Sequence, residues 1–224
     1  MDFKVSFQVN EKLFIKNPES SVTGKHIIEK SVELIHNLGF EHFTFKKLSL
    51  EINCTEATIY RYFENKHKLL LYILNWYWSF IEFLVMFKLQ NITNAKQKLE
   101  IILELLTSDL PENNNKFDYN KKNLTNIIIR ESTKAYLIKE VDFLNKDEFF
   151  KPYKDLCQTI SSIILEYNPK YQYPHSISST IIETAHTHEF FSFNLPKLTD
   201  IENHIESNFT YSFLHQLLFK TISF

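Results

Sequence analysis

The chain contains few of the residues that make tight turns, with only two glycines and six prolines among its 224 residues. β-Sandwiches and barrels need many tight turns, and glycine supplies the backbone conformations that most of those turns require. The scarcity of glycine therefore argues against an all-β protein. It also leaves no glycine-rich loop of the kind that cradles phosphates in nucleotide-binding enzymes. We expect an all-α fold.

Cysteine is scarce, and neither sign of charge is in large excess. Cys54 and Cys157 lie far apart in the sequence, which favours small buried side chains in a reducing cytosol over a disulfide framework. The 25 Lys and Arg are balanced by 27 Asp and Glu, so the chain has no overall attraction to nucleic acid. An acidic second domain could offset a basic first one. Residues 1–4 lack a basic stretch followed by an apolar run, so we expect no signal peptide and a cytoplasmic location.

Apolar and aromatic residues are abundant, and one stretch of them needs a membrane check. Hydrophobic residues make up 44% of the chain, with 21 Phe and 11 Tyr. Residues 69–87 approach the length of apolar sequence that spans a bilayer. This stretch contains Asn75 and Glu82, however, and a charge at the centre of a membrane helix costs about 2.5–3.5 kcal/mol on insertion scales. We favour the central helix of a soluble protein with no membrane partner; a membrane-associated helical protein is an alternative.

The periodicity of the apolar residues changes along the first part of the chain. Residues 3–16 alternate between apolar and polar on either side of a polar turn, which predicts a possible short β-hairpin arm. From Ser21 onward the apolar residues recur at helical spacing. We therefore divide the chain into an N-terminal arm (1–20), a helix-turn-helix domain (21–66) and a helical effector-binding and dimerisation domain (67–224).

Caps mark the boundaries of the predicted helices. Gly39 follows the first helix, where a glycine with positive φ commonly ends a helix. Thr44, Thr55 and Asn65 are suited to cap the next three helices, the last of which is long. Later helical patterns, separated by Pro and Asn clusters, cover approximately residues 94–108, 120–139, 146–167, 176–193 and 199–223.

The most specific motif is the string TEATIYRYFENK at residues 55–66, which two leucines follow at 69 and 70. This string resembles the recognition helix of the TetR family, which typically ends in aliphatic-Tyr-x-Tyr-Phe, a short turn and a lysine. The resemblance covers about residues 21–70. It implies a transcriptional regulator, commonly a repressor that a small molecule releases from its DNA operator. The chain departs from the family where Asn53 replaces the usual turn glycine, and asparagine tolerates the left-handed backbone of such a turn.

We predict that ten residues of this domain contact DNA: Thr44, Lys46, Thr55, Glu56, Ala57, Thr58, Tyr60, Arg61, Tyr62 and Lys66. The resemblance implies backbone contacts at the positions of Thr44, Thr58, Tyr60, Tyr62 and Lys66. Lys46 and Arg61 are included for their charge and position, and Glu56 because a carboxylate can accept from cytosine N4. Simpler interpretations stay open: Tyr62 could be part of the core, Lys46 a solvated face, and both Thr44 and Thr55 helix caps alone.

A single helix-turn-helix reads too few bases, so we expect a homodimer that reads two half-sites. Apolar residues of the last two helical patterns are the predicted dimer interface: Ile181, Ile182, Phe190, Phe209, Phe213 and Leu217. Aromatic residues of the second domain could line a pocket for a small hydrophobic effector: Trp76, Phe80, Phe83, Phe87, Tyr136 and Phe143. Aromatic residues at helical spacing are more often plain core, and the sequence does not identify the effector.

An enzymatic alternative rests on one pair of residues. Glu183 and His186 have the Glu-x-x-His spacing that recurs in helical-bundle metal sites. Such a site needs a second copy of the motif, and the sequence has none. We therefore expect no metal, no cofactor and no catalytic activity, and keep a metal-dependent bundle enzyme as the competing function.

Overall fold

The fold is described from a computed structural model, which covers residues 7, 9–110, 119–200 and 209–223. Every regular element in these residues is a helix and none is a strand, so the predicted all-α class is confirmed. The chain forms two compact units. The first contains Met1–Phe80 and Leu110–Lys151, and the second contains Ile81–Asp109 and Pro152–Phe224.

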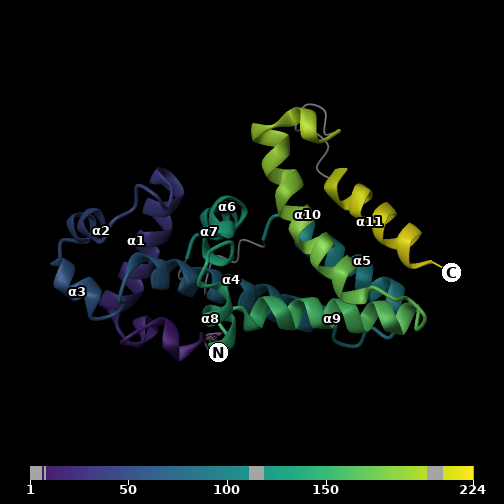
Figure 1. Ribbon diagram of the computed structural model, residues 1–224, viewed down its shortest axis with the longest axis horizontal. Helices are drawn as coiled ribbons and strands as arrows, with labels where there is room; N and C mark the ends of the chain where they lie inside the picture. The colour runs from purple at the N-terminus through teal and green to yellow at the C-terminus, as the bar shows by residue number, and fades with distance from the viewer. Residues whose placement is uncertain (1–6, 8, 111–118, 201–208, 224) are drawn as a thin grey trace. The chain divides into compact units, whose positions relative to one another are not determined.

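The first unit contains the helices that precede α4, the first part of α4 itself and three later helices. Its elements are η1 (Glu11–Leu13), η2 (Pro18–Ser20), α1 (Val22–Leu38), α2 (Phe45–Glu51), α3 (Glu56–Tyr60), the start of α4 (Lys66–Lys88), α6 (Lys121–Glu131), α7 (Thr133–Tyr136) and α8 (Val141–Lys146). Helix α1 packs against η2, α2 and α6, and α2 packs against α3. Within this unit α1, α2 and α3 lie together, as Figure 1 shows.

The second unit is a helical bundle. Its elements are the end of α4, α5 (Ala95–Thr107), α9 (Lys151–Tyr167), α10 (Pro174–Asn194), η3 (Pro196–Leu198) and α11 (Phe209–Ile222). Helices α10 and α11 run side by side, and both pack against α5 (Figure 1). Lys98 forms an ion pair of 2.8 Å with Glu166, and the side-chain amide of Asn168 donates to the carbonyl oxygen of Ile222 over 2.8 Å. These contacts join α5 to α9, and the end of α9 to the end of α11.

The predicted helix caps of the first unit are confirmed. The Thr44 hydroxyl accepts from the Lys47 N–H at 3.2 Å, and the Thr55 hydroxyl accepts from the Thr58 N–H at 3.3 Å. The Asn65 side chain accepts from the N–H of Lys68 at 2.9 Å. Gly39 ends α1 with φ of 76°. Each of these contacts satisfies helix-end groups that have no partner inside the helix.

The possible β-hairpin arm is wrong for the described part of residues 3–16. Glu11–Leu13 form a turn of 3-10 helix, and the Asn10 side chain caps this turn by accepting from Lys12 N–H at 2.9 Å. Leu13 is buried, and the N–H of Ile15 donates to the Tyr62 carbonyl over 2.8 Å. Two isolated strands are marginal in water, and the chain instead anchors its apolar residues on the first unit. Residues 3–6 and 8 of the predicted arm lie outside the described residues.

Two of the later helical patterns contain breaks that their apolar spacing does not reveal. The pattern at 120–139 is divided into α6 and α7, and the pattern at 146–167 starts late because α9 begins at Lys151. Glu148, just before α9, adopts φ of 61°. A left-handed residue cannot continue a helix, so α8 and α9 are separate.

Helix α4 is the only described helix long and apolar enough to cross a membrane, with mean hydropathy 1.5 over its most apolar window. Of that window, 72% is buried inside the protein. Leu69, Leu70 and Phe80 are fully enclosed. Burial therefore accounts for the apolar sequence of α4 as a core helix.

We predict that Gly24→Ala destabilises the first unit. A Cβ at residue 24 would lie 2.2 Å from the carbonyl oxygen and 2.6 Å from the Cα of Pro18, so the backbone of η2 would have to shift. Overpacking of this kind costs about 1–3 kcal/mol of unfolding free energy, measurable by urea denaturation of the whole chain. The control is Thr23→Ala at the exposed neighbouring position, which should change the stability by less than about 0.5 kcal/mol. Equal stability of both variants would show that the close approach of α1 to η2 is not maintained in solution.

Candidate nucleic-acid interface

The short helix α3 is held by buried residues on one face. Ile59 and Phe63 are both fully enclosed, and α3 packs against α2. The turn between the two helices is closed by the Cys54 N–H, which donates to the Ser49 carbonyl over 2.9 Å. Asn53 in this turn has φ of 50°, which confirms the expected left-handed conformation. The helix-turn-helix geometry thus follows from local sequence and from packing behind α3.

The opposite face of α3 is open to solvent. Glu56, Ala57, Tyr60 and Arg61 are exposed at this face. The ring of Tyr60 packs edge-on against Phe45 with centroids 5.0 Å apart, while 48% of the residue remains exposed. This packing fixes the ring and leaves its hydroxyl group accessible.

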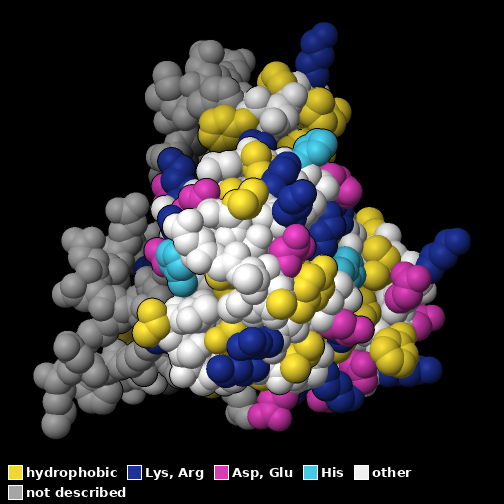
Figure 2. All heavy atoms as spheres, turned by 90° about the vertical axis from the view of Figure 1, so that its left-hand side faces the viewer, with side chains coloured by type: hydrophobic (Ala, Val, Ile, Leu, Met, Phe, Trp, Pro, Cys, Tyr) yellow, Lys and Arg dark blue, Asp and Glu magenta, His cyan; other side chains and the backbone are white. Residues whose placement is uncertain are grey.

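Four further predicted contact residues lie beside this face or on α2. Thr44 and Lys46 are exposed, and Thr55 is exposed at the start of α3. Thr58 is half-buried, with its hydroxyl oxygen 3.0 Å from that of Thr55. Figure 2 views the molecule from the side where Figure 1 draws α2 and α3, and there lysine and arginine side chains alternate with acidic and apolar ones. The charge of the coloured surface in that view is mixed, in line with the small net charge of the chain.

Tyr62 lies in the core, which was the simpler of the two interpretations. It is 4% exposed, and its hydroxyl oxygen is 2.8 Å from the Ser21 hydroxyl oxygen at the start of α1. Its carbonyl accepts the Ile15 N–H, and the ammonium of Lys16 lies 5.2 Å from its ring centroid. Tyr62 therefore joins the N-terminal segment to the helix-turn-helix, and its hydroxyl group is already paired.

Lys66 also has contacts that differ from the expected one. Its ammonium donates to the carbonyl oxygens of Phe40, Glu41 and Phe43 at 2.9, 3.1 and 3.1 Å. Three carbonyls saturate the three donors of a lysine ammonium. Lys66 thus holds the corner between α1 and α2, in the segment that positions α2.

Sequence reasoning missed two residues that bear on this interface. Exposed Lys16 is brought beside the end of α3 by the bond between Ile15 and Tyr62. Glu131, at the end of α6, is buried, and one of its oxygens accepts the Phe40 N–H at 3.1 Å. Its other oxygen lies 2.7 Å from the ammonium of Lys134. No local pattern signals these contacts, since the bond to Phe40 spans 91 residues.

The predicted effector-lining residues are divided between the two units. Trp76 and Phe80 are buried and stacked on each other in the first unit, 5.7 Å apart. Phe83 and Phe87 stack in the second unit, where Phe87 is exposed. Tyr136 is half-buried on α7. Of the six residues, Phe143 lines a described cavity, which lies in the first unit and has a volume of about 810 Å³.

The predicted dimer residues divide by burial. Ile181 and Ile182 are enclosed by the chain's own helices, so they contribute to the core of the second unit. Phe190, Phe209 and Leu217 are half-buried, and Phe213 is 38% exposed. The aromatic rings of Phe209 and Phe213 are stacked, 6.4 Å apart. Apolar surface is also exposed nearby in the sequence, at Phe193, Leu195 and Leu198.

The pair proposed for a metal enzyme is placed in the second unit. The carboxylate of Glu183 accepts a hydrogen bond of 2.7 Å from the Tyr153 hydroxyl. Burial lowers the pKa of His186 to about 4, so its ring is neutral at pH 7. Within the described residues no group of three or more His, Cys, Asp and Glu is arranged to hold a metal ion. The geometry gives the pair a packing and hydrogen-bonding role.

The arrangement of α1 to α3, with one face of α3 buried and the other open, defines a helix-turn-helix protein. Residues 27–73 match the family model described as "Bacterial regulatory proteins, tetR family". The helix-turn-helix domain of the chain is therefore similar to that of the tetR regulators. No curated protein matches the chain.

Several solved structures share the fold over most of the chain. A putative transcriptional regulator from Saccharomonospora viridis, in complex with choline, has a TM-score of 0.64 at 17% identity, covering 88% of this chain and 96% of that one. The fatty acid degradation regulator FadR from Bacillus halodurans has a TM-score of 0.62 at 18% identity, covering 86% and 96%. AibR in complex with isovaleryl coenzyme A and operator DNA has a TM-score of 0.61 at 16% identity, covering 88% and 99%. At these identities the likeness establishes the fold.

We predict that Lys66→Met lowers the free energy of unfolding by about 1–3 kcal/mol, because three carbonyl oxygens lose their donor. Urea denaturation of the full chain measures this change. Lys46→Met is the matched control, since Lys46 is exposed and its side chain has no hydrogen-bond or ion-pair partner among the described residues. A stable Lys66→Met variant with weakened DNA binding would instead show that Lys66 acts directly on DNA.

Proposed function

We propose that this protein is a sequence-specific transcriptional regulator that acts in the cytoplasm as a homodimer and represses transcription until a small-molecule effector releases it from its operator. The observation that carries the proposal is the outward face of α3, with Glu56, Ala57 and Tyr60 exposed while Ile59 is buried. A recognition helix reads a major groove through such an exposed leading end. The match of residues 27–73 to the tetR family supports this use of the face.

The structure reduces the number of predicted residues that we propose to contact DNA. Half-buried Thr58 and eight exposed residues are available to a duplex, and the eight are Lys16, Thr44, Lys46, Thr55, Glu56, Ala57, Tyr60 and Arg61. Tyr62 and Lys66 leave the set because their polar atoms are used inside the protein. We assign Tyr60, Lys16, Lys46 and Arg61 to phosphates, and Glu56 and Ala57 to base edges.

The small number of Lys and Arg side chains at the interface predicts how strongly DNA binding depends on salt. Each neutralised phosphate releases counterions, so binding weakens with salt in proportion to the number of such contacts. With Lys16, Lys46 and Arg61 in each protomer, the salt dependence should be moderate. Glu56 adds repulsion from phosphate, which makes its contribution depend on the base that it faces.

A dimer places two copies of α3 on successive half-sites. The residues proposed for the dimer surface are those of α10 and α11 that the chain leaves partly exposed: Phe190, Phe209, Phe213 and Leu217. Ile181 and Ile182 are excluded because their own unit encloses them. Exposed Phe193 and Leu198 extend the same apolar region in sequence, and an apolar surface of this kind favours burial against a second copy.

The effector proposal draws support from the structural neighbours. Two of them are described with small molecules bound, isovaleryl coenzyme A in one and choline in the other. The two ligands differ in size and charge, so the shared fold does not select an effector class. The class has to come from the cavities of this chain.

We predict that Tyr60→Phe weakens DNA binding about threefold to tenfold for every sequence tested, because the variant keeps the packing on Phe45 and loses one hydroxyl donor. Fluorescence anisotropy with a duplex selected from a random-sequence pool measures the change. Tyr171→Phe in the second unit is the control and should bind as the wild type does. An unchanged affinity for Tyr60→Phe would remove Tyr60 from the interface.

We predict that Glu56→Gln changes sequence preference, because the amide can donate as well as accept, whereas the carboxylate only accepts. Repeating the selection with the variant should return a consensus that differs from the wild type at one position of each half-site. Glu51→Gln, on the exposed end of α2, is the control and should return the wild-type consensus. An identical consensus for Glu56→Gln would place Glu56 away from the bases.

A further inference from the structure

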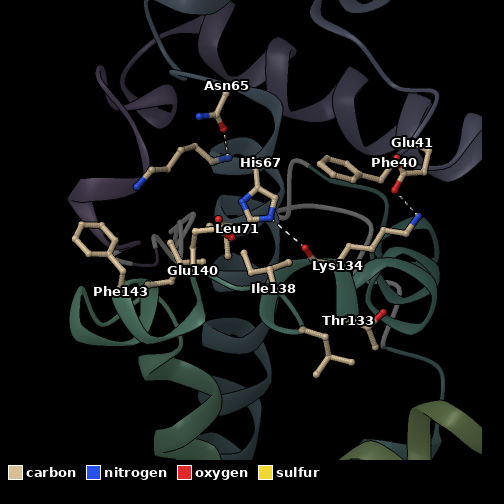
Figure 3. A pocket seen from close by; sticks show the side chains of 13 residues that line it. Phe40, Glu41, Asn65, His67, Leu71, Thr133, Lys134, Ile138, Glu140 and Phe143 are labelled. Atoms are coloured by element: carbon tan, nitrogen blue, oxygen red, sulfur yellow. Dashed lines mark hydrogen bonds and ion pairs between the residues drawn. The ribbon is translucent and has the colours of Figure 1, made fainter.

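We propose that the cavity of the first unit binds a small organic cation with an apolar body, and that this ligand is the effector. The assignment of the ligand as effector rests on the proposed regulatory function. Three segments line the cavity: the corner after α1, the start of α4, and residues 133–144 around α7 and α8 (Figure 3). Its volume of about 810 Å³ lies within the range of sites that enclose drug-sized molecules.

The wall of the cavity is mainly apolar. Six side chains provide it: Phe40, Leu71, Leu137, Ile138, Phe143 and Leu144. Leu137 is 74% exposed and Phe143 is 65% exposed. Large apolar side chains around this cavity remain in contact with water. A ligand that covers them removes their apolar surface from water, which stabilises the complex. The apolar wall therefore favours a ligand with a hydrocarbon body.

The two lysines that line the cavity are already occupied. The ammonium of Lys134 lies 2.7 Å from a carboxylate oxygen of Glu131 and 3.4 Å from one of Glu41. The ammonium of Lys68 donates to the Lys12 carbonyl at 3.2 Å and lies 4.1 Å from the ring centroid of Phe149. An anionic ligand would compete with these partners for the two ammonium groups. It would also meet the carboxylates of Glu41 and Glu140.

Two side chains of the cavity, His67 and Glu140, offer acceptor atoms to a ligand. The Nε2 atom of His67 is 3.1 Å from the Lys134 carbonyl oxygen, and because a carbonyl only accepts, Nε2 carries the proton. The other ring nitrogen, Nδ1, is then left to accept. Among the described residues the carboxylate of Glu140 has no hydrogen-bond or ion-pair partner, and Figure 3 shows Glu140 and His67 at the same cavity. A carboxylate and an imidazole nitrogen beside an apolar wall suit a protonated amine.

The cavity is placed to influence the helix-turn-helix. Phe40 and Glu41 line it from the corner between α1 and α2. The same corner is held from α6 and α7 by the bond between the Phe40 N–H and Glu131 and by the ion pair between Glu41 and Lys134. A ligand that contacts Phe40 and Glu41 as well as Lys134 can favour one arrangement of the corner. Coupling between two sites in proteins typically amounts to about 1–3 kcal/mol.

Isothermal titration calorimetry on the full-length protein without DNA tests the site, with octylammonium chloride as the probe. Sodium octanoate and octanol are the matched anionic and neutral probes. We expect saturable binding of octylammonium with one site per chain, and at least about tenfold weaker binding of octanoate. Binding of octanoate or octanol as tight as that of octylammonium would overturn the assignment of a cation, and absence of octylammonium binding would overturn the site.

A pair of charge variants tests the role of Glu140. Glu140→Gln should weaken octylammonium binding about tenfold, which corresponds to about 1.4 kcal/mol. Asp142→Asn, an exposed acidic residue of α8 outside the cavity lining, should bind as the wild type does. Thermal melts of both variants verify folding. Equal weakening by the two variants would reduce the effect to general surface charge and contradict the proposal.

The effector role has a separate readout, the operator affinity with and without saturating octylammonium. We expect the affinity to fall by about fivefold or more, and Glu140→Gln to need about tenfold more octylammonium for the same fall. If octylammonium binds and operator affinity does not change, the effector role is overturned while the cation site stands. If the protein binds no operator at all, the proposed function fails, and the calorimetric result still decides the site.

Discussion

The interface depends on the anchoring of α3 through Ile59 and Phe63. A helix of five residues has too few internal hydrogen bonds to be stable alone, because nucleation costs more than so short a helix regains. Burial of these two side chains supplies the missing free energy, at about 1.5–3 kcal/mol for each large apolar side chain. The anchored side determines the direction of every other residue on α3. The exposed face of α3 is defined by the burial of the opposite face.

The burial of Ile59 and Phe63 also explains which of the two tyrosines, Tyr60 or Tyr62, is available to DNA. Ile59, Tyr62 and Phe63 are spaced by three and four residues, so they lie on one side of the chain as it leaves α3. Tyr60 then points the other way and stays exposed. The two tyrosines look equivalent in the motif, yet one is a surface donor and the other a link between the N-terminal segment and the start of α1.

The sequence predicts well those features whose partners are close neighbours in the chain. The caps by Thr44 and Thr55, the left-handed Asn53 and the end of α1 at Gly39 each involve partners within about four residues, so local spacing reveals them. Contacts across the fold leave no such mark. The bonds of Lys66 span 23 to 26 residues, and the aromatic residues of α4 stack in two pairs, Trp76 with Phe80 and Phe83 with Phe87.

The contact between Glu131 and the Phe40 N–H spans 91 residues and links the end of α6 to the corner between α1 and α2. A carboxylate that is buried loses its hydration, and among the described residues Glu131 regains partners from the Phe40 N–H and the Lys134 ammonium. Half-formed versions of this contact are unfavourable, because a displaced Glu131 would leave a buried N–H and a buried charge unpaired. The contact therefore favours one well-defined position of the corner between α1 and α2. The proposed cavity is lined by Phe40 and Lys134, which are the partners of Glu131, so this contact offers a path from the proposed ligand to α2.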